Sequence, residues 1–482
     1  MKNSIDDKIG WNFDNTYVGL SEKILTKIKP VTVKEPKLLI LNKSLAENLG
    51  LNFSGINKDE LASIFSGNEL PKNSNCIAQA YAGHQFGHFT TLGDGRAVVL
   101  GEHITKENKR FDIQFKGSGR TPYSRHGDGR AALGPMLREY IISEAINSLG
   151  IPTTRSLAVV STGEMVFRET PLRGAILTRV ASSHIRVGTF QYVALTGDEK
   201  AFKSLLNYTV DRHYPEIKNS NNIALELLKI VIKKQCDLVT NWMRVGFIHG
   251  VMNTDNMAIS GESIDYGPCA FMDNYDLNTV FSSIDRNGRY AYGNQPTITK
   301  WNLARFAETL LPYIDKDKDE AIKITTNAIN EFDSIYEKKW NNMMKAKLGL
   351  IEKKDGDKKI ILDLLNWMEN NKADYTNTFL YLLEDDFKNN KIYEKEAFIK
   401  WYKKWKNRIN NKSLLLMRKS NPSLIPRNHI VENVLKMAEQ NDLKPLNELL
   451  KLVKKPYEKH NGIDDYQKAD KNSNKYQTFC GT

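Results

Sequence analysis

The sequence has few cysteines and no long apolar run. Its 482 residues include four cysteines, Cys76, Cys236, Cys269 and Cys480, which lie far apart and form no C-x-x-C pair. This spacing excludes a disulfide-stabilised scaffold and a zinc ribbon. No apolar run approaches the roughly 20 residues that span a bilayer, and the first residues, MKNSIDDKIGWNF, carry neither a signal-peptide core nor an Arg-rich transit face. We therefore expect a cytoplasmic protein with reduced thiols and no membrane partner.

Basic residues outnumber acidic ones, but without a nucleic-acid-binding pattern. Lys and Arg number 69 against 57 Asp and Glu, which gives a net charge of +12. The excess comes mainly from lysines dispersed through the second half, which is typical of a solvated surface. No RNP, homeodomain or zinc-finger pattern occurs, so we expect no specific nucleic-acid partner. Hydrophobic residues make up 40% of the chain, which is enough to exclude wholesale disorder. We also expect the protein to be a monomer.

The composition changes near residue 300, which predicts two kinds of structure along the chain. Short β-type runs and glycine-rich turns precede it, and long Lys/Glu/Leu-rich stretches with helical apolar spacing follow it. We expect an α/β (α+β) fold with a large C-terminal helical part. The expected units are an N-terminal segment packing on the core (1–80), a first lobe (81–175), a second lobe (176–300), a helical region (301–465) and a flexible tail (466–482).

Several segments before residue 300 carry clear secondary-structure signals. The Gly-Asp-Gly-Arg turn at 93–96 between apolar runs predicts a hairpin. Alternating apolar residues predict a strand over 111–116, and further strands are expected at 157–161 and 175–180. A helix is expected to begin at Pro135, because proline suits the first helical position. A second long helix is expected over 223–244, with Gly246 as its stop.

The order of motifs matches that of protein kinases. A glycine turn, a strand-borne Lys116 and a helix-borne Glu139 are followed by the loop HGVMNTDN at 249–256 and the motif DYG at 265–267. Kinases use a glycine loop over phosphates, a Lys held by a helix Glu, a catalytic loop H-R-D-x-x-x-x-N and a D-F-G that holds Mg²⁺. The collinear order predicts a two-lobed, protein-kinase-like fold with an added N-terminal segment.

One position departs from the kinase pattern. Val251 stands where the catalytic aspartate belongs, and an apolar side chain can neither accept a proton nor orient a hydroxyl. Asn256 and Asp265 retain the oxygen ligands that Mg²⁺ prefers, and a new carboxylate occurs at Asp255. The sequence therefore predicts a nucleotide and metal site with altered chemistry.

Each of these signals has a plainer interpretation when taken alone. Lys116 at a strand end and Glu139 on a helix are ordinarily solvated, Glu144 competes with Glu139 as a partner for Lys116, and Asp265 can simply make a turn. The collinear order of the parts, at workable spacings, favours a functional site.

Three arginines outside the kinase set suggest additional phosphate contacts. Arg179 and Arg186 carry guanidinium groups that can donate to phosphate oxygens in a fork. Arg96 replaces a small residue in the glycine turn. This suggests that a charged side chain, and not the backbone alone, contacts the phosphates. Local pairing is the competing interpretation for each.

With these motifs in view, the sequence resembles the selenoprotein O family of protein adenylyltransferases, kinase-fold proteins long classed as pseudokinases. The resemblance covers nearly the whole chain, and the glycine-rich string from Lys116 to Pro135 is highly specific. The matching segments are FDNTYVGLSE, YAGHQFGHFTTLGDGRAVVLGE, FDIQFKGSGRTPYSRHGDGRAALGPMLREYIISEA, GAILTRVASSHIRVGTF, FIHGVMNTDNMAISGESIDYGPCAFMD, PTITKWNLARFAETLLP and NPSLIPRNHIVE.

The resemblance implies Mg²⁺-dependent transfer of AMP from ATP to Ser, Thr or Tyr hydroxyls of protein substrates, including the enzyme itself. ATP would bind in reverse relative to kinases, with its α-phosphate facing the acceptor. By motif position, Asp255 would accept the hydroxyl proton, Asn256 and Asp265 would bind the metal, and Glu139 would support Lys116. The nucleotide contacts would be Gly93, Gly95, Arg96, Lys116, Asp128, Gly129, Arg179, Arg186 and Asp265.

The family also suggests redox regulation. Its members often carry a selenocysteine or cysteine near the C-terminus, and Cys480 takes that place here, while Cys269 follows the DYGP turn. A disulfide between the two is a hypothesis that the resemblance implies, against the alternative of two unpaired thiols.

Three alternatives remain open at this point. The first is UMP transfer from UTP with Mn²⁺ at the same site, because nothing in these residues reads the base. The second is ordinary phosphoryl transfer. The third is a non-catalytic module that binds nucleotide or uses its basic surface for binding.

Overall fold

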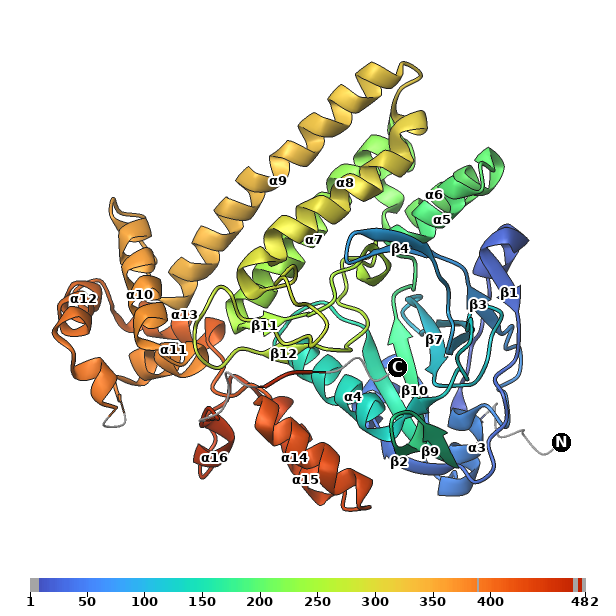
Figure 1. Cartoon of the computed structure of the whole chain (residues 1–482), viewed down its shortest axis with the longest axis horizontal. Coiled ribbons are helices and arrows are strands. Elements are labelled where there is room, and N and C mark those ends of the chain that lie inside the picture. The colour runs from blue at the N-terminus through green and yellow to red at the C-terminus, as the bar shows by residue number, and fades with distance from the viewer. Residues whose placement is uncertain (1–7, 388–389, 471–475, 479–482) are drawn as a thin grey trace.

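The protein has a mixed α/β fold with a large helical C-terminal part (Figure 1). The computed structural model describes residues 8–387, 390–470 and 476–478. In these ranges no helix combines the length and apolar character needed to cross a bilayer. The sheet lies at one end of the molecule, and the helices α10 to α13 lie at the other.

Antiparallel pairing joins eight strands into one sheet, in the order β1-β3-β6-β7-β10-β9-β2, with β8 paired to β10. Two short pairs, β4–β5 and β11–β12, lie outside it. The strands are β1 Leu25–Lys27, β2 Lys37–Leu41, β3 Ile77–Gln79, β4 Ala82–Gln85, β5 His88–Thr91, β6 Ala97–Ile104, β7 Arg110–Lys116, β8 Ala131–Ala132, β9 Arg155–Phe167, β10 Pro171–Ala181, β11 Phe247–Ile248 and β12 Ala270–Phe271.

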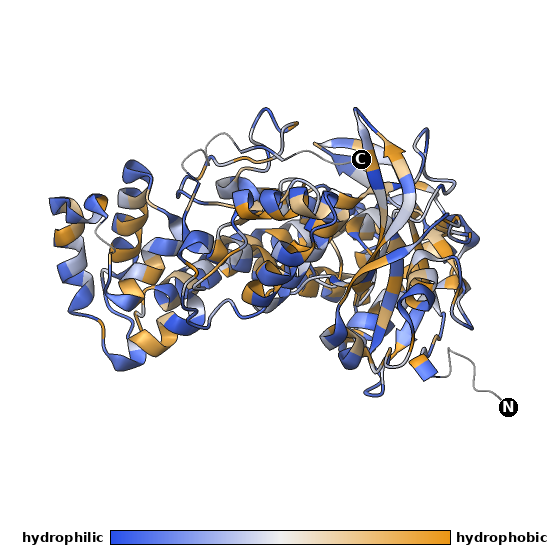
Figure 2. Ribbon diagram, turned by 90° about the horizontal axis from the view of Figure 1, so that it is seen from below, coloured by the Kyte–Doolittle hydropathy of each residue, from blue (hydrophilic) through white to orange (hydrophobic). Residues whose placement is uncertain are grey.

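The described helices, of which the three longest begin after residue 200, occur along the whole chain. They are α2 Lys43–Leu49, α3 Lys58–Ser66, α4 Leu133–Ser148, α5 Val187–Leu195, α6 Glu199–His213, α7 Ile223–Val245, α8 Gln295–Ile314, α9 Lys318–Lys347, α10 Asp357–Asn371, α11 Tyr375–Glu384, α12 Glu396–Lys406, α13 Asn411–Ser420, α14 Asn428–Glu439, α15 Lys444–Val453 and α16 Asp464–Gln467. Figure 2 shows apolar and polar residues alternating along these helices, as expected where one face of a helix is buried.

Strand β7 illustrates how the sequence builds the sheet and the site together. Because successive side chains of a strand point to opposite faces, Ile113 and Phe115 are buried with α2 and α3 on one face. Gln114 and Lys116 point to the other face, where they are also buried. One strand therefore supplies core residues to one side and polar residues to the other.

Helix α4 covers the second face of the sheet and is itself covered. Its apolar residues pack against Val159, Ala175 and Leu177 of β9 and β10, and against α14 and α15 on its outer side. This double contact explains why α4 is buried almost all round, with Glu139 and Glu144 inside. The helical half is built around α7, which packs against α8 and α9; Figure 1 shows α9 running alongside both.

Most of the predicted elements are confirmed, with shifted ends. The helix expected from Pro135 is α4, which begins two residues earlier, and the helix expected over 223–244 is α7, which ends before Gly246 in the left-handed conformation. The strands expected at 111–116, 157–161 and 175–180 are β7, β9 and β10, the last two much longer than predicted because they pair over their length.

The hairpin predicted at the 93–96 turn is wrong. The flanking strands β5 and β6 do not pair with each other: β5 pairs with β4, and β6 pairs with β3 and β7. The turn is instead held by β3, because Asp94 donates its N–H to Gln79 O at 2.9 Å and accepts the Gln79 N–H on its carboxylate at 3.0 Å.

Part of the tail predicted to be flexible packs against the body of the protein. Thr478 is buried and forms a bridge with Ser282, and its hydroxyl donates to Pro268 O at 2.7 Å. Tyr476 accepts from Arg138 at 3.1 Å and donates to Glu432 at 2.6 Å. Thr478 therefore lies beside the DYGP turn.

Candidate active site

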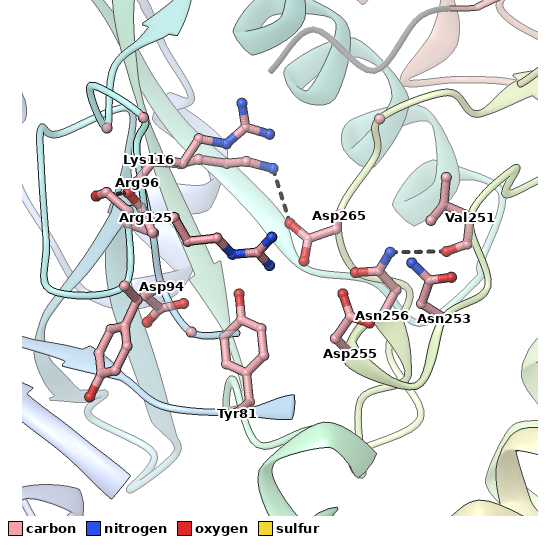
Figure 3. Close-up of a pocket in the computed structure, with 18 of the residues that line it drawn as sticks. Tyr81, Asp94, Arg96, Lys116, Arg125, Val251, Asn253, Asp255, Asn256 and Asp265 are labelled. Carbon is pink, nitrogen blue, oxygen red and sulfur yellow. Dashed lines mark hydrogen bonds and ion pairs between the residues drawn. The ribbon is translucent and has the colours of Figure 1, made fainter. Parts of the chain in front are cut away.

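A cavity of about 370 Å³ lies between the sheet and the loops that follow α7. The 93–97 turn, the 123–130 loop and the ends of β7 and β10 line one side; the loops at 251–256 and 265–268 line the other. Figure 3 shows Arg96 and Lys116 on one wall and Asp255, Asn256 and Asp265 on the opposite wall. The predicted residues that line the cavity are Gly93, Gly95, Arg96, Lys116, Asp128, Gly129, Arg179, Arg186, Asp255, Asn256 and Asp265.

Lys116 is paired with Glu139 beneath the cavity. The Lys116 Nζ–Glu139 Oε2 distance is 2.7 Å, and the Glu139 side chain is only 2% exposed. The second Glu139 oxygen accepts two bonds from Arg179, at 2.7 and 2.9 Å. Burial by itself would raise the pKa of Glu139, but the charges of Arg179 and Lys116 hold it below its usual value. Glu139 is therefore an ionised bridge between two cations.

Glu144, the competing partner of Lys116, lies elsewhere. Its carboxylate accepts two bonds from Arg155, at 2.7 and 2.8 Å, and one from Asn42 at 2.7 Å. An α-helix has 3.6 residues per turn, so two residues five positions apart point to different sides of it. Helix α4 therefore directs Glu139 toward the cavity and Glu144 toward the start of β9.

Asp265 receives three cations. Its Oδ1 accepts from Lys116 at 3.0 Å and from Arg179 at 2.7 Å, and its Oδ2 accepts from Arg186 at 3.0 Å. Although burial would raise the pKa of Asp265, these charges hold it well below its usual range. The backbone φ of 63° at Asp265 is rare for a non-glycine residue. The arrangement keeps the carboxylate ionised and fixed in direction.

Asp255 has a carboxylate oxygen that is buried without a partner among the described residues. Its Oδ1 makes no hydrogen bond, and the residue is 7% exposed. Burial raises the pKa of Asp255 to about 6, and the charge of Arg186 acts in the opposite direction. A Cβ at Gly83 of β4 would stand 2.0 Å from this oxygen, so only glycine permits the close approach. Asp255 thus lines the cavity with a carboxylate whose pKa is raised by burial.

Asn256 and Asp265 form an oxygen pair that fits a divalent cation. Asn256 donates through Nδ2 to Val251 O at 2.9 Å, which turns its amide oxygen toward Asp265 (Figure 3). Within the described parts of the chain, no group of three or more His, Cys, Asp or Glu side chains is placed to hold a metal. Two protein ligands still suit Mg²⁺, which is commonly held by one or two side chains together with substrate phosphates and water.

The cavity is rich in cations. Its lining contains Arg96, Lys116, Arg125, Arg130, Arg168, Arg179 and Arg186 against the carboxylates Asp94, Asp128, Asp255 and Asp265. Asp128 is bound by Arg168 through two contacts, at 2.9 and 3.1 Å, and this ion pair lowers its pKa. The remaining positive charge suits a polyphosphate, because buried cations and fixed donors stabilise phosphate oxygens strongly.

Sequence reasoning missed several residues of this cavity. Tyr81 lies under the Arg186 guanidinium, whose Cζ is 4.4 Å from the ring centroid. Asp94 is buried, and burial raises its pKa to about 6. Arg125 and Arg168 lie on loops, where residue spacing does not predict which way a side chain points. The only available signal was the density of arginines in the glycine-rich string and after β9.

Cys269 is a buried thiol close to this site, and burial raises its pKa to about 12. Cys480 lies outside the described residues. The disulfide between them therefore stays a prediction, although Thr478 contacts Pro268, the residue before Cys269.

The chain is similar to several known proteins. The family model "Protein adenylyltransferase SelO" matches residues 8–454. A protein of Pelagibacter ubique named "Protein nucleotidyltransferase YdiU" is 60% identical over 98% of this chain and 100% of its own length. Proteins with the same name from Nitrosococcus oceani and Bacillus cytotoxicus are 56% and 55% identical, each over 98% of both chains.

Proposed function

The chain belongs to the SelO family of protein adenylyltransferases, and we propose that its cavity transfers AMP from ATP to Ser, Thr or Tyr hydroxyls of proteins. As a member of this family it is a nucleotidyltransferase. The acceptor residue and the choice of ATP are the finer parts of the proposal.

A kinase-like two-lobed arrangement is part of the proposal. The supporting evidence is the ion pair between a strand Lys and a helix Glu, followed by two loops that bring Asn256 and Asp265 to the same cavity. In kinases the corresponding parts bind a triphosphate and its metal. Val251 at the position of the kinase catalytic aspartate argues against ordinary phosphoryl transfer.

One observation carries the proposed reaction: the Asp255 carboxylate lines the same cavity as Lys116, Arg179 and Arg186, and its buried Oδ1 has no hydrogen-bond partner among the described residues. The acceptor hydroxyl oxygen would attack the α-phosphorus, forming a P–O bond, while the bond from the α-phosphorus to the bridging oxygen breaks and pyrophosphate leaves. The hydroxyl proton would pass to Asp255. The cations would neutralise charge on the β- and γ-phosphates, which fits a nucleotide bound in reverse.

Asn256 and Asp265 would hold the metal, with Mg²⁺ as the first choice and Mn²⁺ as the alternative. When bound, the metal supplies charge neutralisation of phosphate oxygens and fixes their geometry. Three cations already compensate Asp265, so Lys116 and the two arginines would turn to the phosphates as the metal takes its place on the carboxylate. The remaining predicted contacts, Gly93, Gly95, Arg96, Asp128 and Gly129, line the same cavity.

Position-specific labelling of ATP tests the proposal. We expect label from the α-phosphate to become covalently bound to protein in the presence of Mg²⁺, in wild type but not in Asp265→Ala. Protein-bound label from the γ-phosphate alone would instead identify a kinase. A scaffold that binds nucleotide without catalysis would bind ATP and transfer neither label.

Base and metal preference need a separate measurement. The same labelling with UTP, and with Mn²⁺ in place of Mg²⁺, separates AMP transfer from UMP transfer. Faster transfer from UTP with Mn²⁺ would replace the ATP assignment while leaving the site unchanged.

A further inference from the structure

A cationic and aromatic patch lies beside the active-site cavity but outside it. We use the name basic-aromatic patch for His84, Phe89, Arg289, Trp301 and Arg305. Arg289 and Arg305 place their Cζ atoms 4.8 and 5.0 Å from the Trp301 ring centroid. His84 contacts both Trp301 and Phe89, with ring centroids 5.2 and 5.1 Å apart, and Phe89 is 44% exposed.

The positive charge of the patch is only partly compensated. Arg305 pairs with Glu308 at 2.6 Å, and Glu308 is half exposed. Arg289 has no carboxylate partner among the described residues, and the Nε of each of the two arginines is buried there without a hydrogen bond. Stacking on Trp301 holds both guanidinium groups in place, which lowers the entropy cost of binding an anion.

The hairpin β4–β5 joins this patch to the catalytic loop. Gly83 and Gln85 lie on the side of β4 near Asp255: a Cβ at Gly83 would touch its Oδ1, and Gln85 lines the cavity together with Asp255. His84 lies between them, and neighbours on a strand point to opposite faces. One face of β4 therefore contacts Asp255, while the opposite face contributes to the basic-aromatic patch.

Hydrogen bonds make the connection rigid. His84 donates its N–H to Thr254 Oγ1 at 2.7 Å, and Phe86 donates its N–H to Asn253 Oδ1 at 3.1 Å. Tyr290, next to Arg289, donates to the same Asn253 oxygen at 2.6 Å. The patch and the loop that carries Asp255 are thus held in a fixed relation.

We propose that the basic-aromatic patch binds an acidic segment of the protein acceptor, a few residues away in sequence from the hydroxyl that is modified. The proposal rests on the proposed function, because it assumes a polypeptide acceptor at Asp255. An extended peptide covers about 3.3 Å per residue, so acidic residues three to five positions from the hydroxyl lie roughly 10 to 17 Å from it along the chain. Carboxylates fit the two guanidinium groups through charge-assisted hydrogen bonds.

The chemistry of the patch favours a peptide over a second nucleotide. The proposed phosphate contacts are cations that line a cavity, whereas the patch includes an exposed phenylalanine, Phe89. Aromatic groups beside arginines are typical of protein interfaces.

Twin peptides test the proposal directly. Both carry fluorescein and a central tyrosine; one has Asp and Glu at three to five positions on each side, and the other has Asn and Gln in their place. Fluorescence anisotropy, without nucleotide, gives the two Kd values. We expect wild type to bind the acidic twin about tenfold more tightly, or about 1.4 kcal/mol, and Arg289→Gln/Arg305→Gln to lose this preference.

Two further variants make the result specific. Lys403→Gln/Lys404→Gln removes the same charge from exposed residues of α12 and is expected to keep the preference. Arg289→Lys/Arg305→Lys keeps both charges and is expected to retain most of it, which covers the case that the Gln variant folds poorly. Equal binding of the twins to wild type, or an equal loss in the Lys403/Lys404 control, would overturn the proposal.

Labelling of the same variants keeps the two proposals apart. If the patch binds the acidic twin but no protein takes up α-label from ATP, the proposed function fails, and only the binding of acidic peptides by the patch stands. If α-label is incorporated and the twins bind alike, the patch proposal fails and the proposed function stands.

Discussion

Asp265 combines two tasks at the scale of a single residue, and its substitution should show both. It compensates Lys116, Arg179 and Arg186 in the structure described, and it is the carboxylate proposed to hold the metal. A general base typically contributes about 10²- to 10⁴-fold to a rate, less than positioning and metal together. We therefore expect Asp265→Ala to lower α-label transfer at least as much as Asp255→Ala, measured under identical conditions.

The same substitution should lower stability. Arg186 has no other carboxylate partner among the described residues, and removing one partner of a buried ion pair leaves an uncompensated charge. We expect Asp265→Ala to lower the free energy of unfolding by roughly 3 kcal/mol, measured by urea unfolding. Asp333→Ala is the control, because Asp333 is 70% exposed and pairs only with Lys300; equal losses in both variants would contradict the argument.

Gly83 is a second residue whose role follows from a single distance. A methyl group there would stand 2.0 Å from Asp255 Oδ1, so the carboxylate must move away from its present position. We expect Gly83→Ala to lower AMP transfer by about 10²-fold or more while ATP binding, measured by thermal shift with Mg²⁺, stays within about twofold. Gly19→Ala, which has open space around the added methyl, should leave both unchanged.

At the scale of elements, the alternation of side chains between the two faces of a strand determines where the polar residues of the site lie. Strand β7 carries Lys116 on the face opposite its buried Phe115, and Arg179 of β10 pairs in register with Gln114. This registry brings the Arg179 guanidinium to 3.2 Å from Gln114 Oε1. The site is therefore assembled by strand pairing, and a change of register by one residue would turn these polar groups into the core.

His103 of β6 links three elements and should give a pH-dependent stability. Its Nδ1 accepts from the Asn12 N–H at 3.2 Å, and its Nε2 donates to Leu49 O at the end of α2 at 2.8 Å. Burial lowers the pKa of His103 in the folded state, so the neutral ring is favoured there. Stability is fully present above the unfolded-state pKa of about 6.5 and is lost as pH falls below it.

This dependence can be measured by urea unfolding at pH 7.5 and pH 5.5. One such histidine contributes at most about 1.4 kcal/mol per pH unit. We expect His103→Gln to flatten the loss of stability on acidification relative to wild type. His126→Gln, at an exposed loop position, should leave the slope as it is; the same slope in all three proteins would exclude the assigned role of His103.

At the scale of the whole molecule, residues near the C-terminus contact segments close to the active-site cavity. Tyr476 contacts Arg138 and Thr478 contacts Pro268, so Thr478 lies against the segment that follows Asp265. We expect a mild oxidant such as diamide to take two electrons and two protons from Cys269 and Cys480 and to join them in an intramolecular disulfide. Non-reducing mass and protease sensitivity of the tail should differ between wild type and Cys480→Ser. Identical behaviour of the two proteins after oxidation would end the idea.

The sequence predicted the elements well where a local pattern was strong. The long helix α7 and the alternating strand β7 were found because their apolar periodicity is sustained over many residues. The hairpin at Asp94 was wrong because a turn signal says that the chain reverses, but not which strands pair; tertiary hydrogen bonds to Gln79 decided that. Arg125 and Arg168 were missed because loop residues have no periodicity to follow.

By itself the sequence determined the order of chemical groups: a glycine turn, Lys116, a helix with two glutamates, an Asp-Asn pair and Asp265. The tertiary structure decided which of these groups meet. It chose Glu139 over Glu144, set three cations on Asp265 and left an oxygen of Asp255 without a partner. The reason is physical: local patterns act over a few residues along the chain, whereas burial and charge compensation depend on distances between segments that only the folded chain brings together.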